Sequence, residues 1–201
     1  MTAIDGLFAA GECSWTYHGA NRLGANSLLS ASVDGWFTLP FTIPNYLADH
    51  LGEEKLAEDS QEAQAAVAQA QERIDRLMGV RGEDPHGPAY YHRQLGDILY
   101  HGCGVSRNVE DLKEAITKIR KLREDFWANV RIPGEANDMN QVLEYGLRVA
   151  DYLDLGELMC VDALDRDESC GAHFREDHLT EDGEAERDDE NLSLIHISEP
   201  T

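Results

Sequence analysis

The sequence has 201 residues, of which 42% are hydrophobic, and its formal net charge at pH 7 is −22. That apolar content permits a sizeable core in one or two domains, whereas the acidic excess excludes a nucleic-acid surface and direct adsorption to anionic lipid, because both need a basic face. No apolar run is long enough to span a membrane and the first residues show no signal-peptide pattern, so the sequence predicts a soluble protein on the cytoplasmic side.

The cysteines are scattered along the chain and form no C-x-x-C pair; they are Cys13, Cys103, Cys160 and Cys170. Structural zinc sites usually use such pairs as ligands. Cys170 and His173 are spaced as one pair of metal ligands could be, but the sequence offers no second pair to complete a site. We therefore expect free thiols in a reducing compartment and no metal site.

The first element is a short apolar run. Residues Leu7 to Ala10 lie between turn signals at Gly6 and Gly11, which predicts a brief buried strand. A polar loop begins at His18, and the apolar pattern from Asn26 to Phe37 predicts a helix. The predicted layout is therefore strand, long polar loop, helix.

This polar loop is suited to anions and polar ligands. Gly19 and Gly24 permit positive φ and a close approach of the backbone, and the first amides of the helix lack intrahelical acceptors at the positive end of its dipole. Arg22 offers two parallel donors to a carboxylate, and Glu12 has oxygens for two ribose hydroxyls. A surface ion pair of Arg22 explains the same residues, so from these residues alone the two interpretations are balanced.

Two prolines follow the predicted helix. Pro40 and Pro44 disfavour helix in the residues before them, with a short helical turn expected only up to His50. The polar and charged stretch from Gly52 to Ser60 indicates a link between two regions.

Four apolar stripes with three- and four-residue spacing then predict helices. The first runs from about Ser60 to Met78 with Gly79 as its C-cap, and the second from Ala89 to His101. Asn108 is expected to cap the third, and Asp138 the fourth and longest. Together they predict an antiparallel helical bundle. The residues expected to face its core are Ala63, Ala66, Val67, Ala70, Ile74, Leu77, Tyr91, Leu95, Ile98, Leu99, Leu112, Ile116, Ile119, Leu122, Phe126, Val142, Leu143, Leu147, Ala150, Leu153, Leu158 and Met159.

The end of the chain has two unusual segments. Residues Glu176 to Glu190 are strongly acidic with few apolar groups, which predicts a solvated extended segment. The last ten residues, Leu192 to Thr201, match the translation of a transposon-derived sequencing adapter, so we interpret them as a non-biological tail.

The stretches GLFAAGEC (from Gly6) and HGANRLGANSLL (from His18) together resemble the second flavin-binding motif of the succinate dehydrogenase and fumarate reductase flavoprotein family, part of which L-aspartate oxidases share. Glu12 lies ten positions before Arg22, as in that family. The resemblance implies an FAD-dependent enzyme in which Glu12 binds the FAD ribose. Ser27 and Leu28 would present their backbone to the isoalloxazine ring, and Arg22 would clamp a carboxylate of succinate or fumarate.

The resemblance covers about Gly6 to Asn191, because segments from Gly102 and from Glu168 also resemble the family's helical domain. It implies a mainly α fold in which residues 1–50 end an FAD-binding α/β domain and 51–191 form an antiparallel helical bundle, with 192–201 as the tail. Met1 would then be internal to a longer protein. The nucleotide fingerprint and the proton-transfer residues would lie upstream, so no catalytic residue is assigned to this chain, which we expect to be inactive alone.

The function implied is that of the flavoprotein subunit of succinate dehydrogenase, an enzyme of the tricarboxylic acid cycle and respiratory electron transport. It would oxidise succinate and pass electrons to an iron–sulfur subunit, a membrane anchor and quinone, at the cytoplasmic side of the inner membrane. Fumarate reductase remains an alternative, because one site serves both directions. L-aspartate oxidase is a weaker alternative, because the Phe174–His178 segment fits that family less well. A non-catalytic helical interaction module is also weaker, because it would not carry the flavin motif.

Two further residues of the resembling C-terminal segment have open roles. His173 and Arg175 would either line the flavin cleft or hold two domains together, and we favour the structural role. Many relatives have arginine where Cys170 stands, so no role of that arginine is transferred to this chain.

Overall fold

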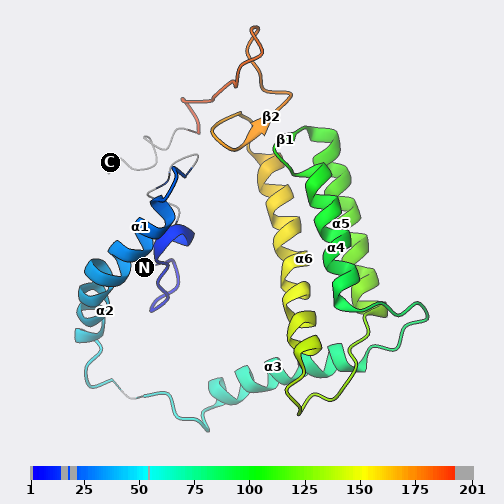
Figure 1. Cartoon of the computed structure of the whole chain (residues 1–201). Coiled ribbons are helices and arrows are strands. Elements are labelled where there is room, and N and C mark those ends of the chain that lie inside the picture. Colours follow the sequence, from blue (N-terminus) through cyan, green and yellow to red (C-terminus); the bar gives the residue numbers. More distant parts are fainter. Residues whose placement is uncertain (1, 15–17, 19–21, 54, 193–201) are drawn as a thin grey trace. The chain divides into compact units, whose positions relative to one another are not determined.

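The computed structural model describes residues 2–14, 18, 22–53 and 55–192. The expected tail therefore lies outside the described residues except for Leu192, as does Gly19 of the polar loop. The chain divides into two compact units, one comprising Met1–Leu56 with Asp189–Thr201 and the other Ala57–Asp188. Both units are helical (Figure 1), which confirms the expected mainly α fold class.

The first unit begins with a loop instead of the expected strand. Leu7 to Ala10 form no strand and Leu7 is about half exposed, so this prediction is wrong. A strand needs a neighbour for its backbone N–H and C=O groups, and the described residues of this unit include no other strand. The chain instead turns into a short 3₁₀ helix, η1 (Gly11–Ser14), and continues to α1 (Asn26–Val33).

The two prolines do not interrupt the helix, contrary to expectation. Helix α1 continues through a π-helical turn, η2 (Asp34–Thr38), into α2 (Leu39–Ala48). Pro40 lies in the first turn of α2, where a missing N–H costs little. Pro44 lies inside α2, where it removes the N–H that would bond to the carbonyl of Pro40 and its ring crowds that carbonyl, yet the helix continues to Ala48.

The second unit is built on three helices that stand side by side: α4 (Pro88–Gly102), α5 (Val109–Asn129) and α6 (Gln141–Asp165). They run alternately up and down (Figure 1), as predicted for an antiparallel bundle. Helix α3 (Gln61–Gly79) instead crosses one end of the bundle and contacts α6. A two-stranded parallel sheet, β1 (Ser106–Arg107) with β2 (Phe174–Arg175), lies at the other end.

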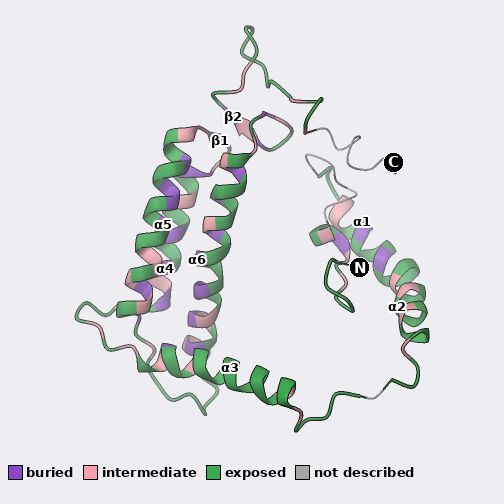
Figure 2. Cartoon of the chain, turned by 180° about the vertical axis from the view of Figure 1, so that it is seen from behind, coloured by how far each residue is buried: buried purple, intermediate pink, exposed green. Residues whose placement is uncertain are grey.

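The core lies between α4, α5 and α6, whose buried residues face one another (Figure 2). Tyr91 and Phe126 are both fully buried and meet edge to face, with ring centroids 5.2 Å apart. Gly102 brings α4 close to α5, because a Cβ there would lie 2.6 Å from that of Ala115. Aromatic packing and close helix contact thus fix the bundle.

Several residues of the predicted stripes lie outside this core. Of the α3 stripe only Leu77 is buried, and Val67 is exposed, because most of α3 extends beyond the bundle (Figure 2). Leu158 and Met159 of α6 are also largely exposed. Their spacing is helical, but Leu158 is exposed and Met159 lines a cavity beside α4 instead of lying in the core.

Side-chain caps begin three of the helices. Ser60 Oγ accepts from the N–H of Ala63 at 3.2 Å, and Asn108 Oδ1 accepts from that of Asp111 at 2.8 Å, which confirms the Asn108 cap. Asn140, and not Asp138, caps α6: its Oδ1 accepts from Val142 and Leu143, each at 3.1 Å.

The acidic C-terminal segment is more ordered than predicted. The N–H of Thr180 bonds to the carbonyl of Glu184 at 2.8 Å, and that of Glu186 to His178 at 3.1 Å, which forms a small hairpin. The N–H of Ser169 in turn bonds to the carbonyl of Glu186 at 2.7 Å. Backbone pairing therefore overcomes the charge repulsion within this stretch.

Candidate functional site

The Gly11–Glu12 turn is held against α1. Gly11 has φ 72°, and its N–H donates to Oδ2 of the buried Asp34 at 2.6 Å. A Cβ at Gly11 would lie 3.2 Å from Cα of Ala31, so only glycine fits both the angle and the approach. This contact positions Glu12 beside the helix. Sequence reasoning missed Asp34, since an acidic residue at the end of an apolar stripe gave no sign of being buried.

Glu12 and Arg22 lie together in the structure. Arg22 Nε donates to Glu12 Oε1, and its Nη1 donates to the carbonyl of Leu23 at 3.2 Å. The Arg22 side chain is 38% exposed and the Glu12 side chain 55%, so both side chains remain open to solvent. The structure thus brings together the two side chains predicted to bind ribose and substrate, here as an ion pair.

The N-terminus of α1 is without a side-chain cap. Ala25 precedes it in the left-handed region with φ 64°, and no side-chain hydrogen bond satisfies the first turn. Leu28 is 75% exposed and Ser27 half-buried, so this turn faces outward. The first amides of such a helix favour an anion.

A cavity of about 300 Å³ lies beside the same helix and is lined by His18, Asn26, Leu29, Ser30, Val33, Asp34 and Thr38. Glu12, Arg22, Ser27 and Leu28 are not among the described residues that line this cavity. The Glu12–Arg22 pair and the uncapped amides of α1 are groups of the kinds that a ribose, a dicarboxylate and an electron-rich ring require.

Arg175 is fully buried at the end of α6. Its Nε and Nη2 donate to the two oxygens of Asp177 at 2.9 and 2.6 Å, and its Nη1 donates to the carbonyls of Ala163, Leu164 and Arg166 at 3.0–3.3 Å. The hydrogen bonds from Arg175 lower the pKa of Asp177. Arg175 therefore joins the C-terminal segment to the last carbonyls of α6 within the second unit.

His173 connects the same end of the bundle to β1. Arg107 has only donors, so its Nη1 donates to His173 Nδ1 at 2.8 Å, which leaves Nε2–H to donate to the carbonyl of Arg166 at 3.0 Å. Burial, and then the positive charges of Arg107, Arg166 and Arg175, lower the pKa of His173. The imidazole is therefore held neutral.

This neutral histidine should make the second unit acid-sensitive. The unfolded chain binds a proton at His173 near the ordinary pKa of 6.5, whereas the folded chain binds it only at lower pH. More protons are then bound in the unfolded state, so stability falls as the pH drops below about 6.5. Urea unfolding of the parent chain and of His173→Gln between pH 7 and 5 measures this. The parent should lose more stability than the variant, and equal losses would contradict the assignment.

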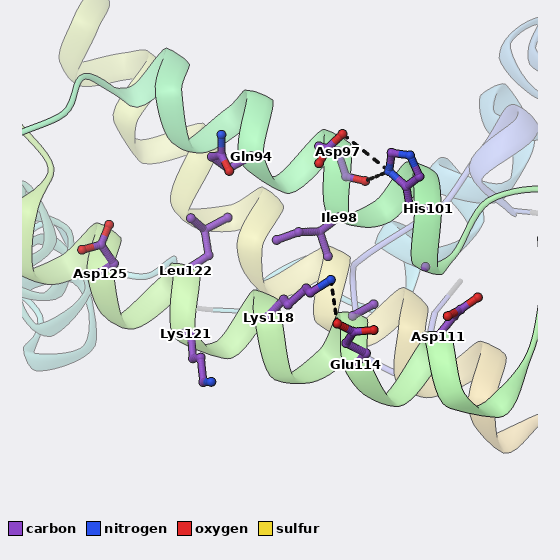
Figure 3. A pocket seen from close by; sticks show the side chains of 12 residues that line it. Gln94, Asp97, Ile98, His101, Asp111, Glu114, Lys118, Lys121, Leu122 and Asp125 are labelled. Carbon is purple, nitrogen blue, oxygen red and sulfur yellow. Dashed lines mark hydrogen bonds and ion pairs between the residues drawn. The ribbon is translucent and has the colours of Figure 1, made fainter.

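A separate groove of about 510 Å³ lies between α4 and α5 (Figure 3). Ile98 and Leu122 lie along it, and charged pairs flank it, among them Lys118 with Glu114 at 2.9 Å. No residue predicted for the flavin site lies here. The described residues also contain no group of three or more histidine, cysteine or acidic side chains able to hold a metal ion.

Comparison with known proteins follows the same division of the chain. The family described as fumarate reductase flavoprotein C-term matches residues 92–199, and the FAD binding domain matches residues 1–28. The first match runs into the expected tail. The second includes Glu12, Arg22, Ser27 and Leu28.

Similar proteins have consistent names. The fumarate reductase flavoprotein subunit of a Serratia species is 35% identical over 95% of this chain and 30% of its own length. The succinate dehydrogenase flavoprotein subunit of Bacillus subtilis is 35% identical over 89% of this chain and 30% of its own. The chain thus spans about 30% of the length of these relatives.

Solved structures agree. A quinol fumarate reductase structure from Escherichia coli has a TM-score of 0.75 at 35% identity, covering 94% of this chain and 30% of that one. The apo Sdh1 complex of Mycobacterium smegmatis has a TM-score of 0.70 at 30% identity, covering 86% and 27%. The resemblance inferred from the two motifs is confirmed, and the chain belongs to the succinate dehydrogenase and fumarate reductase flavoprotein family.

Proposed function

We propose that the protein to which this chain belongs interconverts succinate and fumarate with FAD, as the flavoprotein subunit of a succinate:quinone oxidoreductase. The observation that carries the proposal is the convergence of Glu12, Arg22 and the uncapped start of α1 within the stretch that matches an FAD-binding domain. Fumarate reduction uses the same groups in the opposite direction, and relatives bear both names.

In this proposal FAD supplies the hydride acceptor for succinate oxidation. Glu12 accepts hydrogen bonds from the ribose, and the backbone at Ser27 and Leu28 supports the flavin ring at the positive end of α1. Arg22 holds one substrate carboxylate by two parallel bonds and so fixes the dicarboxylate. Both members of the Glu12–Arg22 ion pair therefore change partners when cofactor and substrate bind. Proton transfer is assigned to no residue of this chain.

The partners proposed are succinate or fumarate, an iron–sulfur subunit and, through it, a membrane anchor and quinone. Support comes from the solved relatives, which are named as a quinol fumarate reductase and an Sdh1 complex. Within the described residues no helix is long and apolar enough to cross a membrane. We propose peripheral attachment through partner subunits at the cytoplasmic side of the inner membrane.

The 201-residue chain alone should neither bind FAD at micromolar concentration nor oxidise succinate, because it spans about 30% of its relatives. Titration of FAD with the purified chain, followed by flavin fluorescence, measures the first, and reduction of an artificial electron acceptor measures the second. Micromolar binding would show that this piece holds the nucleotide unaided.

The function itself is tested on the protein completed with its upstream sequence. After anaerobic addition of succinate, the flavin absorbance should bleach, and addition of fumarate to the reduced protein should restore it. A protein that retains flavin but responds to neither dicarboxylate would overturn the proposed substrate class.

A further inference from the structure

Two cysteines of the second unit, Cys103 and Cys160, belong to the core of the bundle. Cys103 is the C-cap residue of α4, and its N–H donates to the carbonyl of Leu99 at 2.9 Å. Cys160 lies in α6 and is fully buried, while Cys103 is 7% exposed. Cys103 Sγ lies 3.9 Å from the carbonyl of Met159, the residue that precedes Cys160, so the Cys103 thiol packs against α6 beside Cys160, and each thiol shifts the pKa of the other.

The surroundings make the two sulfurs unequal. The hydrogen bond from Cys160 lowers the pKa of Cys103 to about 6, with a further contribution from the positive charge of Arg107, although burial opposes both. The same hydrogen bond and burial raise the pKa of Cys160. Arg107 is held nearby because its Nε donates to the carbonyl of Gly104 at 2.9 Å. One thiol is thus prepared to ionise while the other remains protonated.

The two cysteines differ in their exposure to solvent. Cys103 stands where α4 ends, in a bend that leads to Val105, which is 86% exposed. Cys103 is 7% exposed and Cys160 is fully buried, so Cys103 is the outer residue of the two. This order of access matches a dithiol in which the outer sulfur attacks first and the inner one completes the reaction.

We propose that Cys103 and Cys160 form a redox-active dithiol, which small disulfides oxidise to a disulfide joining the end of α4 to α6. The Cys103 thiolate attacks one sulfur of the small disulfide and expels a thiolate, which leaves a mixed disulfide on Cys103. Cys160 then attacks the Cys103 sulfur, expels the second small thiolate and passes its proton to it. Two protein thiols are oxidised and one small disulfide is reduced to two thiols. This inference does not rest on the proposed function.

The test uses the full chain with Cys13→Ser and Cys170→Ser, so that only the pair remains. The chain is incubated with glutathione disulfide, quenched in acid and alkylated, and its intact mass is measured. We expect the loss of two alkylation sites without a glutathione adduct. The reaction rate should level off above pH about 6, whereas an ordinary thiol keeps accelerating to about pH 8.5.

Single variants separate the two sulfurs. In that background Cys160→Ser should accumulate one glutathione adduct on Cys103, and Cys103→Ser should accumulate none. The same oxidation is carried out on the folded chain and on the urea-unfolded chain. If both thiols of the folded chain can still be alkylated while those of the unfolded chain are oxidised, the proposal is wrong. Equal adducts on the two single variants would also overturn it. The main measurement is the intact mass of the chain that retains both Cys103 and Cys160. The test therefore does not depend on whether the single variants fold.

Discussion

Arg22→Ala, made in the protein completed with its upstream sequence, should lower kcat/KM for succinate by about a hundredfold or more. Removing a charge-assisted bidentate contact costs on the order of 2–4 kcal/mol in the transition state. Arg22→Lys should recover little of this loss, since an ammonium cannot make two parallel hydrogen bonds to a carboxylate. Steady-state kinetics, measured beside flavin absorbance per protein, should show that both variants keep FAD.

Glu12→Ala is the matched control, because Glu12 is the partner of Arg22 in the ion pair. If the pair matters only as an exposed surface contact, the two alanine variants should behave alike and nearly normally. In the proposed site they separate: Glu12→Ala loses flavin, and Arg22→Ala keeps flavin but loses turnover. Near-normal kinetics of Arg22→Ala would show that Arg22 does not bind the substrate and forms only a surface ion pair in the loop.

Arg175→Ala should lower the free energy of unfolding of the second unit by about 1–3 kcal/mol or more, because buried carbonyls lose their donor. The substitution leaves Asp177 without its bidentate partner and the last carbonyls of α6 without a donor in a buried place. Arg175→Lys should recover only part of the loss, because lysine replaces a fork of donors by a single ammonium. Urea unfolding followed by helix content measures the change.

Arg148→Ala provides the comparison, since Arg148 also pairs with an acidic residue, Glu144, but on the exposed face of α6. Its removal should leave the unfolding midpoint where it was. If Arg175→Ala unfolded at the same midpoint as Arg148→Ala, the buried hydrogen bonds of Arg175 would not hold the C-terminal segment to α6.

The helical bundle was predictable because its signals are local. Three- and four-residue spacing and Asn108 located α5, and the order of α4, α5 and α6 followed from their short connections. Which face of each helix is buried depends on neighbours that spacing does not identify. Val67 and Leu158 were therefore placed in the core, although they are exposed.

The errors in the first unit have a different cause. The strand expected at Leu7–Ala10 depends on a partner strand, and local apolarity says nothing about one. Pro40 and Pro44 were expected to disfavour helix in the residues before them. Pro40 lies in the first turn of α2, where its missing N–H is not needed, and the helix continues past Pro44 despite the hydrogen bond lost there.

The candidate site was predictable in its membership but not in its contacts. Glu12 and Arg22 were identified by their motif, ten positions apart, and their mutual ion pair follows from a turn that Asp34 holds against α1. Asp34 is distant in sequence from that turn, so no local pattern signalled it.

The most direct test of the proposed site is a crystal structure of the completed protein with FAD and fumarate. We expect a Glu12 carboxylate bonded to the ribose of FAD, an Arg22 guanidinium bonded to a fumarate carboxylate, and no ion pair between Glu12 and Arg22. An intact Glu12–Arg22 ion pair in the presence of both ligands would contradict the proposed roles of these two residues.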